Sequence, residues 1–233
     1  MTPQSTLQPA LFNTARASTL PQSSESTQVY VLTFEGAVTP VLDQYIADGI
    51  ETATTQNAEA LILQLDTPGG SVDITKSINQ KILGSSVPVV VYVAPAGAHA
   101  GSAGTFITLA GHAAAMAPGS SIGAASPVGG GGEDIGETME AKVTNILTAD
   151  IENLASRRGE EATEWAIAAV EEAAAATAQQ ALDLGVIDFI VPNLSTLLDE
   201  LDGFEVTVQG ATQTLNTKNA FITRVELNSI QRF

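Results

Sequence analysis

The chain has 233 residues, of which 44% are hydrophobic and only 5% aromatic, so its length suits one large domain with an aliphatic core. Its 26 acidic residues against 9 Lys and Arg give a formal net charge of -17, which argues against binding to nucleic acid or to anionic lipid. The absence of cysteine excludes disulfides, thiol nucleophiles and cysteine-based zinc sites.

The first half of the chain is predicted to alternate strands and helices after a flexible leader over residues 1–28, which is rich in Ser, Thr, Gln and Pro. The strands are continuously apolar, which is typical of a parallel sheet that is covered on both faces. They are expected at 29–34, 60–65 and 87–93, with helices at 40–56 and 74–83, and the alternation continues through 102–109 and 113–117.

The second half opens with a glycine-rich acidic loop at 127–137 and then becomes mainly helical. Helices are expected at 138–158, 161–174, 177–184 and 194–201, with one further strand at 186–191. The segments 204–208 and 221–227 alternate apolar and polar residues, which predicts a small β-hairpin. The predicted organisation is therefore a leader, a domain over 29–202 and a C-terminal β appendage over 203–233.

Ser102 is the candidate nucleophile because it lies in a cluster of small residues between a buried strand and a predicted helix. A serine at such a junction points its hydroxyl out of the carboxyl edge of the sheet, where open α/β sheets bind ligands. The helix N-terminus adds a field that favours an anion. On pattern alone, a turn that serves only tight packing remains the favoured interpretation.

A second turn, Asp66-Thr67-Pro68-Gly69-Gly70, follows the strand at 60–65 and is a candidate oxyanion hole. Glycine lets a backbone N–H approach a reacting carbonyl without an intervening side chain. The amides of Gly70 and Ala103 are the expected donors, and Gly69 and Gly101 are expected to contact substrate. An ordinary Pro-Gly turn is the alternative.

The base that would activate Ser102 is sought among two histidines and four lysines. His99 and His112 are expected to be loop or capping residues, and His112 lies at the far end of the predicted helix. Lys76 and Lys81 are expected to face solvent, and Lys218 lies in the predicted C-terminal appendage.

Lys142 is the remaining candidate base, since it follows the glycine-rich loop beside Met139, Val143 and Ile146 at helical spacing. A lysine base must be neutral near pH 7, so apolar burial would have to lower its pKa by about 3 units. A helix lysine whose stem lies on the apolar surface while its amine stays in water is the alternative that pattern alone favours.

Three segments of the chain together resemble the NfeD family, membrane-associated serine proteases of the ClpP/crotonase superfamily that are often paired with stomatin-like proteins. The segments are 57–70, with its Asp-Thr-Pro-Gly-Gly turn, 97–105 around Ser102, and 116–124. The resemblance covers about 29–202 and implies an α/β fold of repeated ββα units with a mostly parallel sheet.

The resemblance also implies a Ser-Lys dyad and a partner. The family's serine lies in an Ala-Ser-Ala-Gly-Thr context that falls on Ser102, although Gly101 replaces the usual alanine. Its lysine lies in a Lys-(Ile/Val)-Thr-Asn context that falls on Lys142. The histidine of the ClpP triad would fall near Pro127, where none is present.

The activity of the family implies that this chain is a serine endopeptidase that needs no cofactor or metal. The implied substrate is a hydrophobic segment of a stomatin-like membrane protein. A homodimer is implied, with membrane association in the full-length protein and the protease domain outside the cytoplasm.

Two alternative functions stay open. One is a crotonase-type acyl-CoA enzyme, against which the lack of a basic cluster for the CoA phosphates counts. The other is a catalytically weak scaffold that binds stomatin-like proteins.

Overall fold

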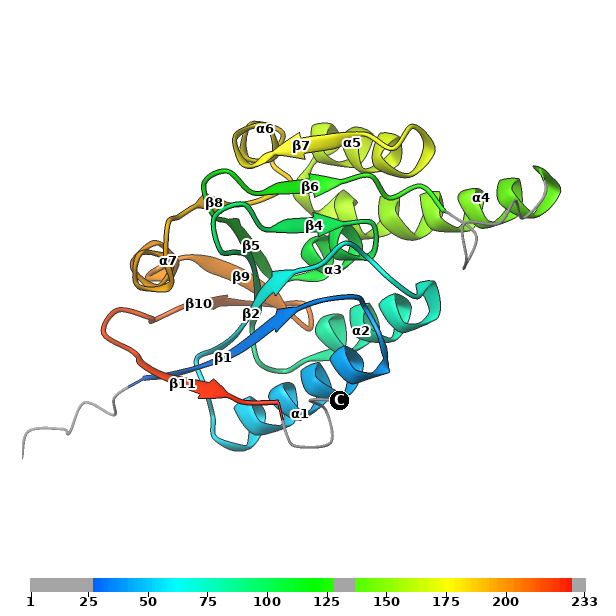
Figure 1. Cartoon of the computed structure of the whole chain (residues 1–233). Coiled ribbons are helices and arrows are strands. Elements are labelled where there is room, and N and C mark those ends of the chain that lie inside the picture. The colour runs from blue at the N-terminus through cyan, green and yellow to red at the C-terminus, as the bar shows by residue number, and fades with distance from the viewer. Residues whose placement is uncertain (1–26, 128–136, 228–233) are drawn as a thin grey trace, which may run out of the picture.

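The computed structural model describes residues 27–127 and 137–227, shown in Figure 1. Most of the predicted leader and of the glycine-rich loop lies outside these ranges. The elements in chain order are β1 (Gln28–Glu35), α1 (Pro40–Thr55), β2 (Ala60–Asp66), α2 (Val72–Gly84), β3 (Val89–Val93), β4 (His99–Gly101), α3 (Ala103–Ala110), β5 (Ala113–Met116), β6 (Ser121–Gly123), α4 (Glu137–Ala155), a 3₁₀ turn (Ser156–Arg158), α5 (Glu160–Glu171), β7 (Ala175–Thr177), α6 (Ala178–Asp183), β8 (Phe189–Ile190), α7 (Leu194–Leu201), β9 (Glu205–Val208), β10 (Ala211–Thr214) and β11 (Phe221–Val225).

The centre of the molecule is a six-stranded sheet in the order β11-β1-β2-β3-β5-β8, and each neighbouring pair runs parallel. This confirms the predicted α/β architecture with a mostly parallel sheet. β2 shows why the run at 60–65 is almost wholly apolar. Leu61 and Leu63 pack into one core cluster, Ala60 and Ile62 into another, because successive side chains point to opposite faces.

Two layers cover the sheet. One face packs against α1 to α5, and the other against α7 and the β9–β10 hairpin, as Figure 1 allows the reader to follow. Within the described ranges, no helix is long and apolar enough to cross a bilayer.

A second sheet of three short strands, β4-β6-β7, stands beside the central one and was missed by the sequence-based prediction. β4 and β6 pair in parallel, whereas β6 and β7 are antiparallel. Each of these strands has three residues and is too short to show a periodic pattern. This small sheet matters because Ser102 follows β4 directly.

The predicted C-terminal hairpin is wrong in its pairing. The segment 204–208 contributes β9, which pairs antiparallel with β10 across the two-residue turn Gln209-Gly210, both with positive φ. β11 instead extends the central sheet in parallel with β1. The Tyr45 hydroxyl donates to the carbonyl of Val225, which ties this last strand to α1. Alternation identified the strands, but it carries no information about which strand pairs with which.

The predicted strand at 186–191 is reduced to β8, and the remaining helices lie within a few residues of their expected bounds. α6 begins at the predicted position because Thr177 and Gln180 form a reciprocal capping box.

His112 joins two strands of the central sheet. The backbone N–H of Val89 donates to its Nδ1 at 3.0 Å, so Nδ1 must be unprotonated. Burial, reinforced by the nearby charge of Arg157, lowers the pKa of His112 to about 4. The sequence-based interpretation of His112 as a structural residue fits this arrangement.

The depressed pKa of His112 predicts a pH-dependent stability. The unfolded chain takes up this proton below its ordinary pKa of 6.5, whereas the folded chain resists it until about pH 4. Stability is therefore lost as the pH falls from about 6.5 towards 4, by roughly 2–3 kcal/mol from this group. His112→Asn keeps an acceptor for the Val89 N–H but cannot titrate. Urea unfolding of both proteins at pH 7, 5.5 and 4 should show the smaller loss in the variant, and parallel losses would contradict this role.

Candidate active site

Ser102 has a backbone conformation that non-glycine residues rarely adopt, with φ 49° and ψ -112°. It is the residue between β4 and α3. Its N–H donates to the carbonyl of Gly123 at 2.9 Å, and its own carbonyl accepts from the N–H of Thr105, also at 2.9 Å. The serine is thus held from both sides, and its side chain is partly exposed.

Thr105 supplies the support beneath the serine. Its hydroxyl is fully buried and lies 3.0 Å from the carbonyl of Ala100 and 3.2 Å from that of Gly123, while it accepts from the N–H of Gly123 at 3.1 Å. One side chain therefore ties α3 to β4 and β6. The role of Thr105 was not predicted, because a threonine inside a predicted helix gives no sign of such contacts.

The turn after β2 packs directly onto Ser102. Gly69 has φ +116°, and a Cβ at this position would lie 2.6 Å from the Ser102 Cβ. Thr67 fixes the turn, since its backbone N–H donates to the carbonyl of His99 and its carbonyl accepts from Gly101. Its hydroxyl also accepts from the N–H of Gly69 at 3.1 Å. Glycine is required at position 69 by the close approach to the serine.

The predicted oxyanion donors, Gly70 and Ala103, lie at the same cavity as Ser102. Within the described ranges, neither backbone N–H has a hydrogen-bond partner. Ala103 is the first residue of α3, where the N–H groups of a helix are free and the helix dipole favours negative charge. The two amides are therefore available to an oxygen that develops charge beside Ser102.

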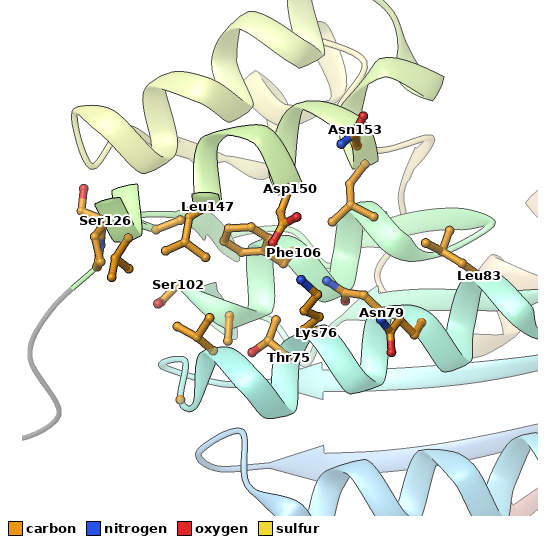
Figure 2. A pocket seen from close by; sticks show the side chains of 18 of the residues that line it. Thr75, Lys76, Asn79, Leu83, Ser102, Phe106, Ser126, Leu147, Asp150 and Asn153 are labelled. Atoms are coloured by element: carbon orange, nitrogen blue, oxygen red, sulfur yellow. The ribbon is translucent and has the colours of Figure 1, made fainter. Parts of the chain in front are cut away.

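A cavity of about 590 Å³ extends from Ser102 between α2, α3 and α4 (Figure 2). Its walls are largely apolar, and the partly exposed Val72, Leu83 and Met139 stand at its rim. The lining residues are Gly70, Val72, Thr75, Lys76, Asn79, Gln80, Leu83, Ser102, Ala103, Phe106, Ala125, Ser126, Pro127, Met139, Val143, Leu147, Asp150, Asn153, Leu154 and Arg157. Apart from the serine and its neighbours, sequence patterns had not indicated this cavity.

Lys142 lies on the helix that was expected to carry it, but on a face that is open to water. It is on α4, but its side chain is exposed and is not part of the cavity wall, which Met139 and Val143 provide. Consecutive helical residues point about 100° apart, so Val143 can face the cavity while Lys142 faces water. This arrangement fits the alternative that pattern alone favoured, and it lacks the apolar burial that a neutral lysine base would need. Lys76, expected to face solvent, is exposed and also lines the cavity.

Neither histidine hydrogen-bonds to Ser102 in the described part of the chain. The Nδ1 of His99 lies 2.8 Å from the Ser121 hydroxyl, and its ring occupies the space where a Gly101 side chain would be. Among the described residues, no group of three or more His, Asp or Glu side chains is placed to hold a metal ion.

The fold and this strand-to-helix serine place the chain among ClpP-like α/β proteins. ClpP1 from Listeria monocytogenes superposes with a TM-score of 0.57 at 16% identity, over 72% of this chain and 94% of that one, which supports the fold alone. A family model described as the NfeD1b N-terminal domain matches residues 28–211. The chain belongs to this NfeD1b N-terminal domain family.

Two curated proteins are similar in sequence to this chain. The membrane-bound protease PH1510 of Pyrococcus horikoshii is 40% identical over 195 residues, covering 82% of this chain and 44% of that protein. The membrane protein NfeD1b of Bacillus subtilis is 29% identical over 195 residues, covering 78% and 43%. The chain thus spans less than half the length of these relatives.

Solved structures of 1510-N, described as a membrane-bound stomatin-specific protease, superpose closely. A serine-to-alanine variant gives a TM-score of 0.80 at 36% identity, over 86% of this chain and 98% of that one. A lysine-to-alanine variant in complex with a substrate peptide gives 0.81 at 34% identity, over 89% and 96%.

The contact between His99 and Gly101 yields a test of the site's packing. A Cβ at Gly101 would lie 2.3 Å from the His99 Nε2. Gly101→Ala should therefore displace the ring and destabilise the fold by about 1–3 kcal/mol. In the double variant with His99→Ala, much of the lost stability should be recovered. Urea unfolding of the wild type, the two single variants and the double variant measures the coupling free energy between the two positions.

Gly84→Ala is the matched control for the Gly101→Ala change, because a Cβ there meets nothing within 4 Å. It should leave stability nearly unchanged. Strictly additive effects of His99→Ala and Gly101→Ala would contradict the packing contact.

Proposed function

We propose that this chain is a serine endopeptidase in which Ser102 is the nucleophile and Lys142 the general base. The observation that carries the proposal is the strained Ser102 beside the two unpaired N–H groups of Gly70 and Ala103, all on one largely apolar cavity. Preorganised donors next to a nucleophile are what acyl transfer requires.

The proposed chemistry proceeds in two steps. The Ser102 Oγ attacks the peptide carbonyl carbon while neutral Lys142 Nζ takes its proton, and the Gly70 and Ala103 amides bind the resulting oxyanion. Lys142 then returns that proton to the leaving amine, which breaks the C–N bond and leaves an acyl-enzyme. Water attacks the ester carbon and gives a proton to Lys142. The bond from that carbon to the Ser102 Oγ then breaks, Lys142 returns the proton to Oγ, and the peptide acid departs.

Support for Lys142 comes from the relatives and from its position on α4. The solved structures of 1510-N include one variant of a serine and one of a lysine. In that sequence the substituted serine and lysine are separated by nearly the same number of residues as Ser102 and Lys142 are here. Met139 and Val143, neighbours of Lys142 on α4, already line the cavity. The dyad requires the Lys142 amine to reach Ser102 when substrate is bound.

The substrate proposed is a hydrophobic segment of a stomatin-like membrane protein. The apolar wall of the cavity suits such a segment, and the 1510-N structures are described as a stomatin-specific protease. Gly69 and Gly101 would border the scissile residue, since neither carries a side chain beside Ser102. We also propose a homodimer, and a full-length protein that is membrane-associated with this domain outside the cytoplasm, in line with the membrane-bound relative.

The two alternatives predict different behaviour. A crotonase-type acyl-CoA enzyme needs cations for the CoA phosphates, yet the described cavity wall contains only Lys76 and Arg157 as basic residues. The Nη2 of Arg157 lies 2.6 Å from the carbonyl of Leu109 and 3.2 Å from that of Gly111, so the group is already engaged. A non-catalytic scaffold would bind peptides without cutting them.

Peptide cleavage by three variants tests the dyad. Ser102→Ala and Lys142→Ala should each lower kcat/KM for a hydrophobic peptide by at least about 1,000-fold, because the nucleophile and its base act as one unit. Lys142→Arg should fail equally, since a guanidinium stays protonated. Cleavage products are followed by mass spectrometry.

Lys76→Ala is the matched control for the lysine variants, because Lys76 is the lysine that this structure places on the cavity wall. It should retain activity within about tenfold. If Lys76→Ala abolishes cleavage while Lys142→Ala does not, the assignment of the base is wrong. If Ser102→Ala cuts as fast as the wild type, or CoA thioesters are turned over instead, the peptidase proposal fails.

A further inference from the structure

Asn79 is a buried polar residue in the wall of the cavity. It lies on α2 and is only 8% exposed, and its amide oxygen makes no hydrogen bond to the part of the chain that the structure describes. No hydrogen bond joins its amide nitrogen to the described chain either. A buried carboxamide without a partner destabilises the fold, so such groups usually serve a ligand, an ion or a water molecule.

Asn79 lies about two helical turns along α2 from the end of the helix that adjoins the candidate oxyanion hole. Val72 begins α2 near Gly70, and Asn79 follows seven residues later, about 10 Å further along the helix axis. An extended peptide advances about 3.3 Å per residue, so this distance corresponds to about three substrate residues. Figure 2 shows Ser102 and Asn79 well apart along the same cavity, with Thr75 and Lys76 of α2 between them.

Polar groups of α4 stand across the cavity from Asn79. Asp150 and Asn153 line the cavity at this level, and Figure 2 shows both beyond Leu147 as seen from Ser102. Arg157 lines it too, but its Nη2 already lies within hydrogen-bond distance of two backbone carbonyls at the end of α3. The cavity therefore offers both acceptors and donors at the level of Asn79, and Lys76 of α2 adds a cation to the same wall.

We propose that Asn79 forms a polar subsite that binds a side-chain carboxamide, Gln or Asn, about three residues from the scissile bond of an otherwise apolar peptide. This rests on the proposed peptidase function and narrows its substrate. A substrate carboxamide carries one acceptor and two donors, so it can pair with the amide of Asn79 in both directions and reach the Asp150 carboxylate. A leucine at the same substrate position would leave Asn79 without a partner, which is how such sites discriminate.

A set of apolar peptides, each with one glutamine at a different position, tests the subsite beside their all-leucine parent. The wild type should prefer the peptide whose glutamine lies about three residues from the cut, by about tenfold in kcat/KM. Asn79→Leu should lose this preference and cut the parent peptide at least as fast. Mass spectrometry gives both the site and the rate of cleavage.

Gln80→Leu is the matched control, since it makes the same chemical change one residue along α2 at an exposed position of the cavity. It should keep the preference for glutamine. A thermal melt separates a ligand-binding role from a structural one. Asn79→Leu should melt at a higher temperature than the wild type, because it removes a buried amide that nothing in the fold satisfies, whereas a structural Asn79 would give a lower melting temperature.

Binding to the Ser102→Ala variant makes the outcome independent of cleavage. Fluorescence anisotropy should show tighter binding of the preferred glutamine peptide than of the parent, and the double variant with Asn79→Leu should bind both equally. Equal binding of both peptides by Ser102→Ala itself would overturn the subsite. Selective binding without any cleavage by the wild type would instead overturn the peptidase proposal and leave the subsite supported.

Discussion

The close approach of two turns, one after β2 and the other after β4, is the constraint on which the site depends. A Cβ on Gly69 would lie 2.6 Å from the Ser102 Cβ, so the turns can meet only because position 69 is glycine. Their contact brings the N–H of Gly70 to the cavity into which Ser102 opens. Thr67 maintains the contact, because its backbone pairs with His99 and Gly101 on the serine-bearing strand. The arrangement of the candidate oxyanion hole follows from this packing.

The strain at Ser102 is supported by a small sheet rather than by the central one. A non-glycine residue at positive φ costs of order 1–3 kcal/mol, and hydrogen bonds around it must offset that cost. Here Gly123 on β6 accepts from the serine N–H, and Thr105 is bonded to both Gly123 and Ala100. The central sheet sets where the strands end, and β4-β6-β7 fixes the exposed serine at that edge.

Much of the central architecture could be predicted from the sequence, because the relevant signals are local. Apolar runs such as that at 60–65 indicated strands covered on both faces, and the sheet is parallel as expected. The glycine turn and Ser102 could be placed at one edge because each comes after an expected strand, at 60–65 and 87–93, and parallel strands bring their carboxyl ends to one edge. The short strand β4 that directly precedes Ser102 was not predicted.

Features that depend on tertiary packing could not be predicted in the same way. The partner of Phe221–Val225 is β1, almost the whole chain away, and alternation alone gives no hint of it. Helical spacing placed Lys142 beside apolar residues but could not fix which side of α4 faces the cavity. The unpartnered amide of Asn79 is likewise visible only once α2, α3 and α4 are placed around the cavity.

The most direct test of the account is a crystal structure of the protein after reaction with a fluorophosphonate, whose phosphorus mimics the tetrahedral intermediate. The account predicts a covalent bond from phosphorus to the Ser102 Oγ, with the phosphoryl oxygen about 3 Å from the N–H groups of both Gly70 and Ala103. An adduct on another serine, or a phosphoryl oxygen that contacts neither amide, would contradict it.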